Sequence, residues 1–214
     1  MELHTALACA YVRGAMPEWA GLDEATLLER GRAEGLPLHR FKRTAALPRV
    51  ARVLGHLQGL EPTSILDLGS GRGVFLWPLL EAVRGVAITA VDKNPHRVRD
   101  IDRVARGGVL RLAAVEADLE GLPFEDLAFD VVTALEVLEH LERPERAARE
   151  IVRVARRFAV VSVPSRADDN PEHIQLFHAP SLTSLFLDAG ASRVDIDWVP
   201  GHMIGVVNVG RANP

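Results

Sequence analysis

The chain has 214 residues, of which 48% are hydrophobic and 25% are charged, a composition typical of globular domains. The net charge of −4 provides no overall field that would attract nucleic acid, and Cys9, the single cysteine, excludes an internal disulfide. No apolar run is long enough to span a membrane, and no basic segment precedes the mildly apolar N-terminus as in a secretory signal. We therefore expect a cytoplasmic protein with one main domain and a modest appendage.

The first part of the chain, residues 1–60, carries apolar side chains at helical spacing. A first helix is expected over Leu3–Tyr11, a second from Asp23, and a third from Pro48 that ends near Gly59. We interpret residues 1–60 as a helical extension that caps the domain that follows.

From residue 61 onward, short apolar segments alternate with amphipathic ones, which is typical of buried parallel strands joined by helices. Strands are expected at Ser64–Leu68, Val86–Val91, Val109–Glu116, Phe129–Leu135, Phe158–Val163, Arg193–Trp198 and Met203–Val209. Helices are expected at Val74–Val83, at Pro95–Arg106, from Pro144 to about Ala155, and at Ser181–Asp188. The last two strands are too close in sequence for a parallel crossover, so they must form an antiparallel hairpin.

A glycine-rich turn follows the first buried strand, with the sequence Asp67-Leu68-Gly69-Ser70-Gly71-Arg72-Gly73. Glycine lets the backbone turn tightly and lie against a ligand, and the start of the next helix offers N–H groups and a positive dipole end. A dinucleotide-binding turn would carry its third glycine one residue later, at Val74. The spacing therefore argues against a nicotinamide-dependent oxidoreductase.

Acidic residues stand at the ends of the next two strands. Asp92 lies 19 residues after Gly73, where a carboxylate can accept both hydroxyls of a ribose. Since Asn94 is placed to cap the following helix, Asp92 is left for a ligand. Asp118 ends the third strand, where it can accept the exocyclic amine of adenine, although an aspartate there also serves ordinary turns.

Together these segments resemble the class I, Rossmann-like methyltransferases that use S-adenosylmethionine (SAM). The resemblance runs from Thr63 to Val209 and includes the glycine turn, Asp92, and the segments Glu116–Asp118 and Phe129–His140. It implies an α/β fold with a doubly wound, mostly parallel seven-stranded sheet in the order 3-2-1-4-5-7-6, the last strand antiparallel. Residues 61–214 would form the SAM-binding domain, with S-adenosylhomocysteine as the product.

The resemblance also assigns roles to individual residues. Asp67 would hold the methionyl amine of SAM, Asp92 would grip the ribose, and Asp118 with the backbone of Leu119 would face adenine. Glu136, after the fourth strand, would border the methionine and the acceptor. The expected cofactor contacts are Asp67, Gly69, Ser70, Gly71, Gly73, Asp92, Lys93, Asp118, Leu119 and Glu136.

The segment Glu136-Val137-Leu138-Glu139-His140 places two carboxylates and an imidazole at helical spacing, and His173 follows downstream. We predict that His140 and His173 contact the acceptor or act as a base. The layout is also similar to that of metal-dependent small-RNA 2′-O-methyltransferases, but the Phe-Glu-Trp-Thr segment of that family is absent. We therefore favour an interpretation without a metal, in which these groups cap and charge the next turn.

The function that these features favour is transfer of a methyl group from SAM to a small-molecule acceptor of unknown identity. The alternatives are a metal-dependent RNA 2′-O-methyltransferase and a SAM-binding module without catalysis. Nucleic acid is the less favoured partner, and the sequence does not indicate an oligomeric state.

Overall fold

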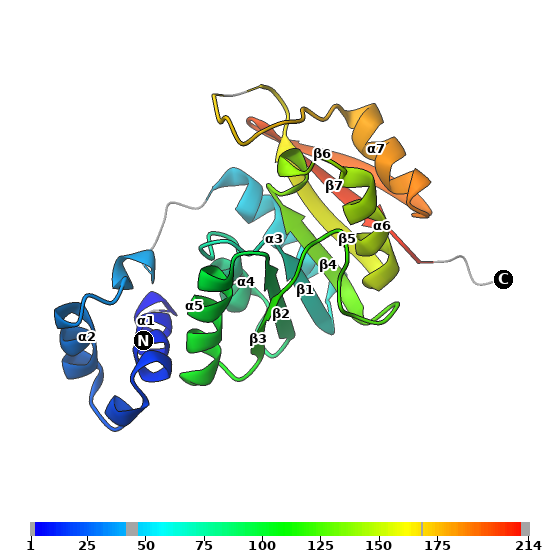
Figure 1. Cartoon of the computed structure of the whole chain (residues 1–214). Coiled ribbons are helices and arrows are strands. Elements are labelled where there is room, and N and C mark those ends of the chain that lie inside the picture. The colour runs from blue at the N-terminus through cyan, green and yellow to red at the C-terminus, as the bar shows by residue number, and fades with distance from the viewer. Residues whose placement is uncertain (1–2, 42–46, 168, 211–214) are drawn as a thin grey trace.

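The computed structural model describes residues 3–41, 47–167 and 169–210. Its core is a seven-stranded sheet in the order β3-β2-β1-β4-β5-β7-β6, as predicted (Figure 1). The strands are β1 (Ser64–Leu68), β2 (Ala87–Asp92), β3 (Leu112–Glu116), β4 (Phe129–Leu135), β5 (Ala155–Pro164), β6 (Arg193–Val199) and β7 (His202–Asn208). Neighbours from β3 to β5 are parallel, whereas β7 is antiparallel to both β5 and β6.

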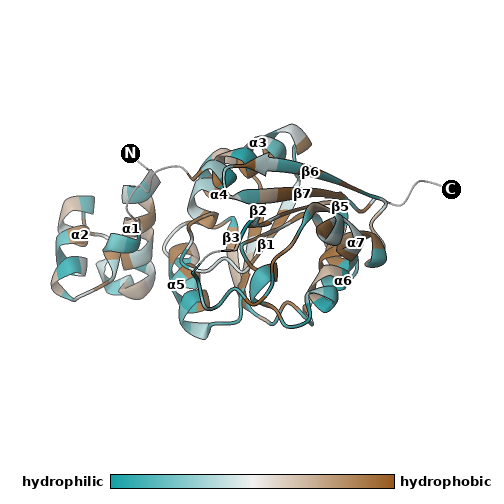
Figure 2. Cartoon of the chain, turned by 90° about the horizontal axis from the view of Figure 1, so that it is seen from above, coloured by the Kyte–Doolittle hydropathy of each residue, from teal (hydrophilic) through white to brown (hydrophobic). Residues whose placement is uncertain are grey.

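Helices cover both faces of the sheet. The α-helices in the described ranges are α1 (Leu3–Ala15), α2 (Glu24–Ala33), α3 (Pro48–Leu60), α4 (Leu76–Ala82), α5 (Pro95–Arg106), α6 (Pro144–Val154) and α7 (Ala179–Asp188). Helix α2 packs against α1, on the side away from the sheet (Figure 1). Side chains of α1, α3, α4 and α5 share one buried cluster with Ile65, while those of α6 and α7 share another with Leu66. Adjacent residues of β1 thus face opposite sides, as the pleat requires. Figure 2 shows the hydrophobic strands enclosed by helices whose outer surfaces are hydrophilic.

Two predicted helix starts are set by side-chain caps. The Asp23 carboxylate accepts the backbone N–H groups of Ala25 and Thr26, both at 3.1 Å, and begins α2. The Asn94 side chain accepts the N–H of His96 at 2.9 Å and begins α5. Each cap satisfies N–H groups that have no partner within the helix, so short-range chemistry fixes these boundaries.

Several boundaries differ from the prediction by a few residues, and three of them have a clear local reason. Helix α3 continues past Gly59 and ends where Glu61 adopts a left-handed φ of 46°. Strand β3 begins at Leu112, because the Leu112 N–H folds back onto the carbonyl of Val109 in a turn. Ala155 leaves α6 and opens β5, where it pairs with β4.

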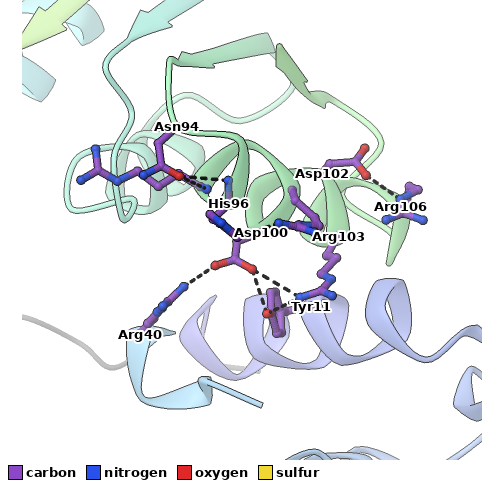
Figure 3. Close-up of polar contacts among 10 residues, drawn as sticks. Tyr11, Arg40, Asn94, His96, Asp100, Asp102, Arg103 and Arg106 are labelled. Atoms are coloured by element: carbon purple, nitrogen blue, oxygen red, sulfur yellow. Dashed lines mark hydrogen bonds and ion pairs between the residues drawn. The ribbon is translucent and has the colours of Figure 1, made fainter. Parts of the chain in front are cut away.

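The N-terminal helix α1 lies along α5, beside the β3 edge of the sheet (Figure 1). Glycines permit this approach: a Cβ at Gly14 would lie 1.9 Å from the carbonyl oxygen of Arg103. The Tyr11 hydroxyl donates to Asp100 at 3.0 Å, and Arg40 pairs with the same carboxylate (Figure 3). Backbone contact and a polar cluster together fix α1 beside α5. Within the described ranges, no helix is both long and apolar enough to cross a membrane.

Replacing the glycine at this contact should weaken the fold. We expect Gly14→Ala to lower the free energy of unfolding by about 1 to 3 kcal/mol, because the added methyl group overlaps a backbone carbonyl. Gly55→Ala is the matched control: it lies within α3 with nothing within 4 Å of an added Cβ, and should be neutral or stabilising by up to ~1 kcal/mol. Urea unfolding measures both. Equal stability of Gly14→Ala and the parent protein would contradict the close contact.

Candidate functional site

The glycine turn is anchored on the neighbouring strand β2. The N–H groups of Gly69 and Ser70 both donate to the carbonyl of Val91, at 2.8 and 3.1 Å. Gly69, Gly71 and Gly73 have φ angles of 68°, 57° and 83°, a left-handed backbone that favours glycine. The sequence of glycines at alternate positions is therefore required by the backbone path itself.

The three glycines differ in what surrounds them. A Cβ at Gly69 would lie 2.4 Å from Cγ2 of Val137, and one at Gly73 would lie 2.1 Å from the indole nitrogen of Trp77. At Gly71 an added Cβ would meet only the Gly69 carbonyl oxygen, at 3.6 Å. Two of the glycines thus allow close packing, whereas the third faces open space.

A cavity lies over this turn, at the carboxyl end of β1 and β4. Five of the ten expected cofactor contacts line it, namely Asp67, Gly69, Ser70, Gly71 and Glu136. Helix α3 contributes Arg49 and Val50 to the lining of the cavity. Ligands of open α/β sheets bind at this edge, so the cavity is a candidate ligand site at the position that the sequence pattern indicated.

Asp67 lies buried at the cavity, with 2% of its surface exposed. The hydroxyls of Ser70 and Thr133 donate to its two carboxylate oxygens, at 2.7 and 2.8 Å. Burial nevertheless raises the pKa of Asp67 to about 6, and the charge of Asp92 adds to the rise. A carboxylate held out of water in this way favours a cationic ligand, such as an ammonium group.

Asp92 is buried at the end of β2 and makes contacts of its own. Its two carboxylate oxygens accept the N–H groups of Gly71 and Asn94, both at 2.9 Å, and Arg97 lies 3.4 Å away. The sequence prediction that Asn94 caps α5 is correct, but Asp92 also has a local role. It joins the end of β2 to the apex of the glycine turn.

Three further expected contacts, Lys93, Asp118 and Leu119, follow the ends of β2 and β3 and do not line this cavity. Lys93 follows β2 and is exposed. Asp118 follows β3, is exposed, and accepts the N–H of Glu120 at 2.8 Å, while Leu119 is buried. Asp118 therefore makes the ordinary turn contact that the sequence also allowed.

Glu136 sits directly after β4 with a left-handed φ of 55°. One carboxylate oxygen accepts the Ser162 hydroxyl at 2.8 Å, and the other lies 3.0 Å from Nε2 of His202 and 3.7 Å from Nε of Arg49. A left-handed conformation is unfavourable for glutamate, and these contacts hold the side chain at the cavity wall in spite of it.

His140 and His173 are brought together, although 33 residues separate them in sequence. Their ring centroids lie 4.9 Å apart, and Nδ1 of His140 lies 2.8 Å from the carbonyl oxygen of Glu172. His140 belongs to a short 3₁₀ turn, Leu138–His140, and neither histidine lines the cavity above the glycine turn. The pair forms a separate cluster beside Glu139.

Residues 66–162 match the family model of the methyltransferase domain. A probable S-adenosylmethionine-dependent methyltransferase of Mycobacterium tuberculosis is 34% identical over 136 residues, which cover 59% of this chain and 47% of that protein. A malonyl-[acyl-carrier protein] O-methyltransferase of Geobacter sulfurreducens is 38% identical over 98 residues, which cover 45% of this chain and 36% of the relative. The chain therefore spans less than half the length of these curated relatives.

The fold is also similar to that of solved methyltransferases. The crystal structure of magnesium protoporphyrin IX methyltransferase from Synechocystis, with bound S-adenosylhomocysteine, superimposes with a TM-score of 0.62. The likeness covers 87% of this chain and 99% of that one at 15% sequence identity. Residues 66–162 are therefore similar to a methyltransferase domain, and the strand order and overall fold are like those of solved methyltransferases.

Sequence reasoning did not identify four residues that contact Asp67 or Glu136 at the cavity. The Thr133 hydroxyl donates to Asp67 and the Ser162 hydroxyl donates to Glu136. Arg49 reaches the cavity from α3. His202 opens β7, which runs antiparallel, so it lies at the edge where β4 and β5 end. The predicted hairpin held a signal for His202, because its direction places the start of the last strand at the site.

The hydroxyl of Thr133 should control the protonation of Asp67. The raised pKa means that the folded protein binds this proton more tightly than the unfolded chain, whose aspartates titrate near pH ~4. The group therefore favours folding fully below that pH, and this contribution is lost as the pH rises through about 6. Thr133→Val removes a donor to the carboxylate and should raise the pKa of Asp67 further.

Carboxyl-carbon NMR titration measures this pKa directly. Ser162→Ala serves as the control, since its hydroxyl donates to Glu136 instead of Asp67. A pKa for Asp67 in Thr133→Val that is no higher than in Ser162→Ala would show that the Thr133 hydroxyl does not support the carboxylate.

Proposed function

We propose that this protein transfers the methyl group of SAM to a small-molecule acceptor. The observation that carries the proposal is the cavity of the methyltransferase domain. There, three left-handed glycines and a buried carboxylate with a raised pKa meet at one sheet edge. A desolvated carboxylate beside an open glycine turn suits the methionyl ammonium and carboxylate groups of SAM.

In this proposal SAM lies along the carboxyl edge of β1, β2 and β3. Asp67 holds the amine, and the turn from Gly69 to Gly73, including Ser70 and Gly71, lines the amino-acid end. Asp92 and Lys93 contact the ribose, while Asp118 and the backbone of Leu119 face adenine. The order of these residues along adjacent strands matches the order of the groups in the cofactor, which supports the placement.

The reaction is an in-line displacement at a methyl carbon that the sulfonium charge already activates. A lone pair of the acceptor forms the new bond to carbon, while the carbon–sulfur pair stays on sulfur and yields neutral S-adenosylhomocysteine. The protein's task is to align acceptor, carbon and sulfur and to exclude water. Glu136 borders the methyl group in this placement, and Arg49, which also lines the cavity, lies 3.7 Å from its carboxylate.

An acceptor hydroxyl or amine also loses a proton in the reaction. We predict that His140 and His173 contact the acceptor, as expected from the sequence. His202 is a further candidate for the proton acceptor, because it lies 3.0 Å from the Glu136 carboxylate at the cavity wall. The carboxylate stabilises the charged imidazole that proton transfer creates.

A small-molecule acceptor is favoured over RNA. The net charge of −4 opposes a phosphate backbone, and the Geobacter relative is named for a malonyl group on a carrier protein. Helix α3, from the proposed extension 1–60, contributes Arg49 and Val50 to the cavity wall and would shape the acceptor side.

Label transfer tests the activity itself. The purified chain is incubated with SAM labelled on the methyl carbon and with fractionated cell extract, and the label is followed by mass. We expect S-adenosylhomocysteine and an equal amount of label in a small-molecule fraction. Label in RNA would establish the RNA alternative. SAM binding with no S-adenosylhomocysteine formed in any fraction would identify a module without catalysis.

Asp92 should be required for cofactor affinity. We expect Asp92→Asn to bind S-adenosylhomocysteine about 10- to 100-fold more weakly, since the amide retains only one acceptor oxygen for the ribose and the turn. Asp102→Asn is the control, because this carboxylate lies on the exposed face of α5 and pairs with Arg106. Isothermal titration measures both, with circular dichroism to verify folding. Equal affinities in a folded Asp92→Asn would exclude our ribose placement.

A further inference from the structure

Three potential metal ligands converge beyond the cavity: Glu139, His140 and His173. One donor atom of each lies within 4.8 Å of the other two. Glu139 and His140 come from the 3₁₀ turn that follows Glu136, while His173 comes from the connection between β5 and α7. The fold thus gathers a carboxylate and two imidazoles from two separate segments.

Main-chain hydrogen bonds hold the two segments together. The carbonyl oxygen of Glu139 accepts the N–H groups of Ile174 and Gln175, at 3.0 and 3.2 Å. The N–H of His173 donates to the carbonyl of Asn170 at 3.0 Å. His173 therefore stands beside Glu139 because its backbone is fixed there, and the grouping does not depend on the side chains alone.

The surroundings of His140 select the tautomer that a metal ligand needs. Its Nδ1 lies 2.8 Å from the carbonyl oxygen of Glu172, and a carbonyl only accepts hydrogen bonds. Nδ1 therefore carries the proton, and Nε2 presents a lone pair. Metal-bound histidines have this arrangement, with the second ring nitrogen donating to a carbonyl or carboxylate.

Glu139 is fully buried, and one of its carboxylate oxygens lies 4.0 Å from Nε2 of His173. A buried carboxylate is stabilised by hydrogen bonds or by nearby positive charge, and a metal ion supplies such charge. The alternative suggested by the sequence, that these groups cap the next helix, does not describe α6. Its N-cap residue is Arg143, which makes no side-chain cap bond.

We propose that Glu139, His140 and His173 bind a divalent ion of the first transition series. Two imidazoles and one carboxylate suit Zn²⁺ or Co²⁺ better than Mg²⁺, which prefers oxygen ligands. Such ions bind nitrogen and oxygen at about 2.0 to 2.2 Å, so the donor atoms move together on binding. Three protein ligands leave coordination positions for water or a bound molecule.

The place of the ion in the fold indicates its use. The ligand turn begins two residues after Glu136, which lines the cavity above the glycine turn. An open coordination position there would take an oxygen of the acceptor and orient it. This last step rests on the proposed function, whereas metal binding itself does not. His140 and His173 then contact the acceptor through the ion instead of as bases.

Cobalt binding tests the site. The full chain is stripped with a chelator and titrated with Co²⁺, and the visible absorption of coordinated Co²⁺ is followed with Zn²⁺ as competitor. We expect one equivalent to bind and His140→Ala or His173→Ala to weaken binding at least ~10-fold. His96→Ala, an exposed histidine on α5, is the matched control and should bind as the parent does. No saturable binding, or equal binding by His140→Ala and His96→Ala, would overturn the proposal.

Two further measurements separate this proposal from the proposed function. Glu139→Gln should also lose the absorption band of bound Co²⁺, and circular dichroism shows whether this variant is folded. If it unfolds, the results for His140→Ala and His173→Ala decide whether the site exists. S-adenosylhomocysteine is titrated into the same samples. Cofactor binding without metal binding would overturn the metal site alone. Metal binding without cofactor binding or label transfer would overturn the proposed function alone.

Discussion

The hydrogen bond from the Gly71 N–H to the Asp92 carboxylate joins the glycine turn to the end of β2, and the shape of the cavity depends on it. With the bonds from Gly69 and Ser70 to the carbonyl of Val91, it keeps the turn folded over the end of β2. The left-handed glycines make this path accessible, and the parallel register of β1 and β2 brings its two ends together. The cavity is thus a product of sheet register as much as of glycine content.

The strands and helices could be predicted because their signals are local, whereas the strand order followed from the resemblance to SAM-dependent methyltransferases. Unalternating apolar segments mark strands buried on both faces, and Asp23 and Asn94 mark helix starts through their own caps. The short final connection can only be antiparallel, which fixes the direction of β7. Each of these inferences uses residues within a few positions of one another, so no tertiary information is needed.

The parts that could not be predicted are contacts between distant segments. The hydroxyl of Thr133 on β4 reaches Asp67 on the neighbouring strand β1. His202 of β7 contacts Glu136, which follows β4, with β5 between the two strands. Nothing in the spacing of these residues indicates such pairing, since it depends on the stagger of strands. The helical spacing of Glu136 and His140 was likewise misleading, because Glu136 turns toward Ser162 and leaves His140 on a 3₁₀ turn.

Glu136 marks the boundary between two chemically different regions. Before Glu136 in the chain, β4 contributes Thr133, whose hydroxyl donates to the buried carboxylate of Asp67. After Glu136, the 3₁₀ turn contributes Glu139 and His140 to the cluster with His173. A left-handed glutamate costs about 1 kcal/mol or more, and a glycine would avoid that cost. Glycine, however, would leave Ser162 and His202 without their carboxylate partner. The left-handed backbone at Glu136 therefore accompanies two contacts that only an acidic side chain at this position makes.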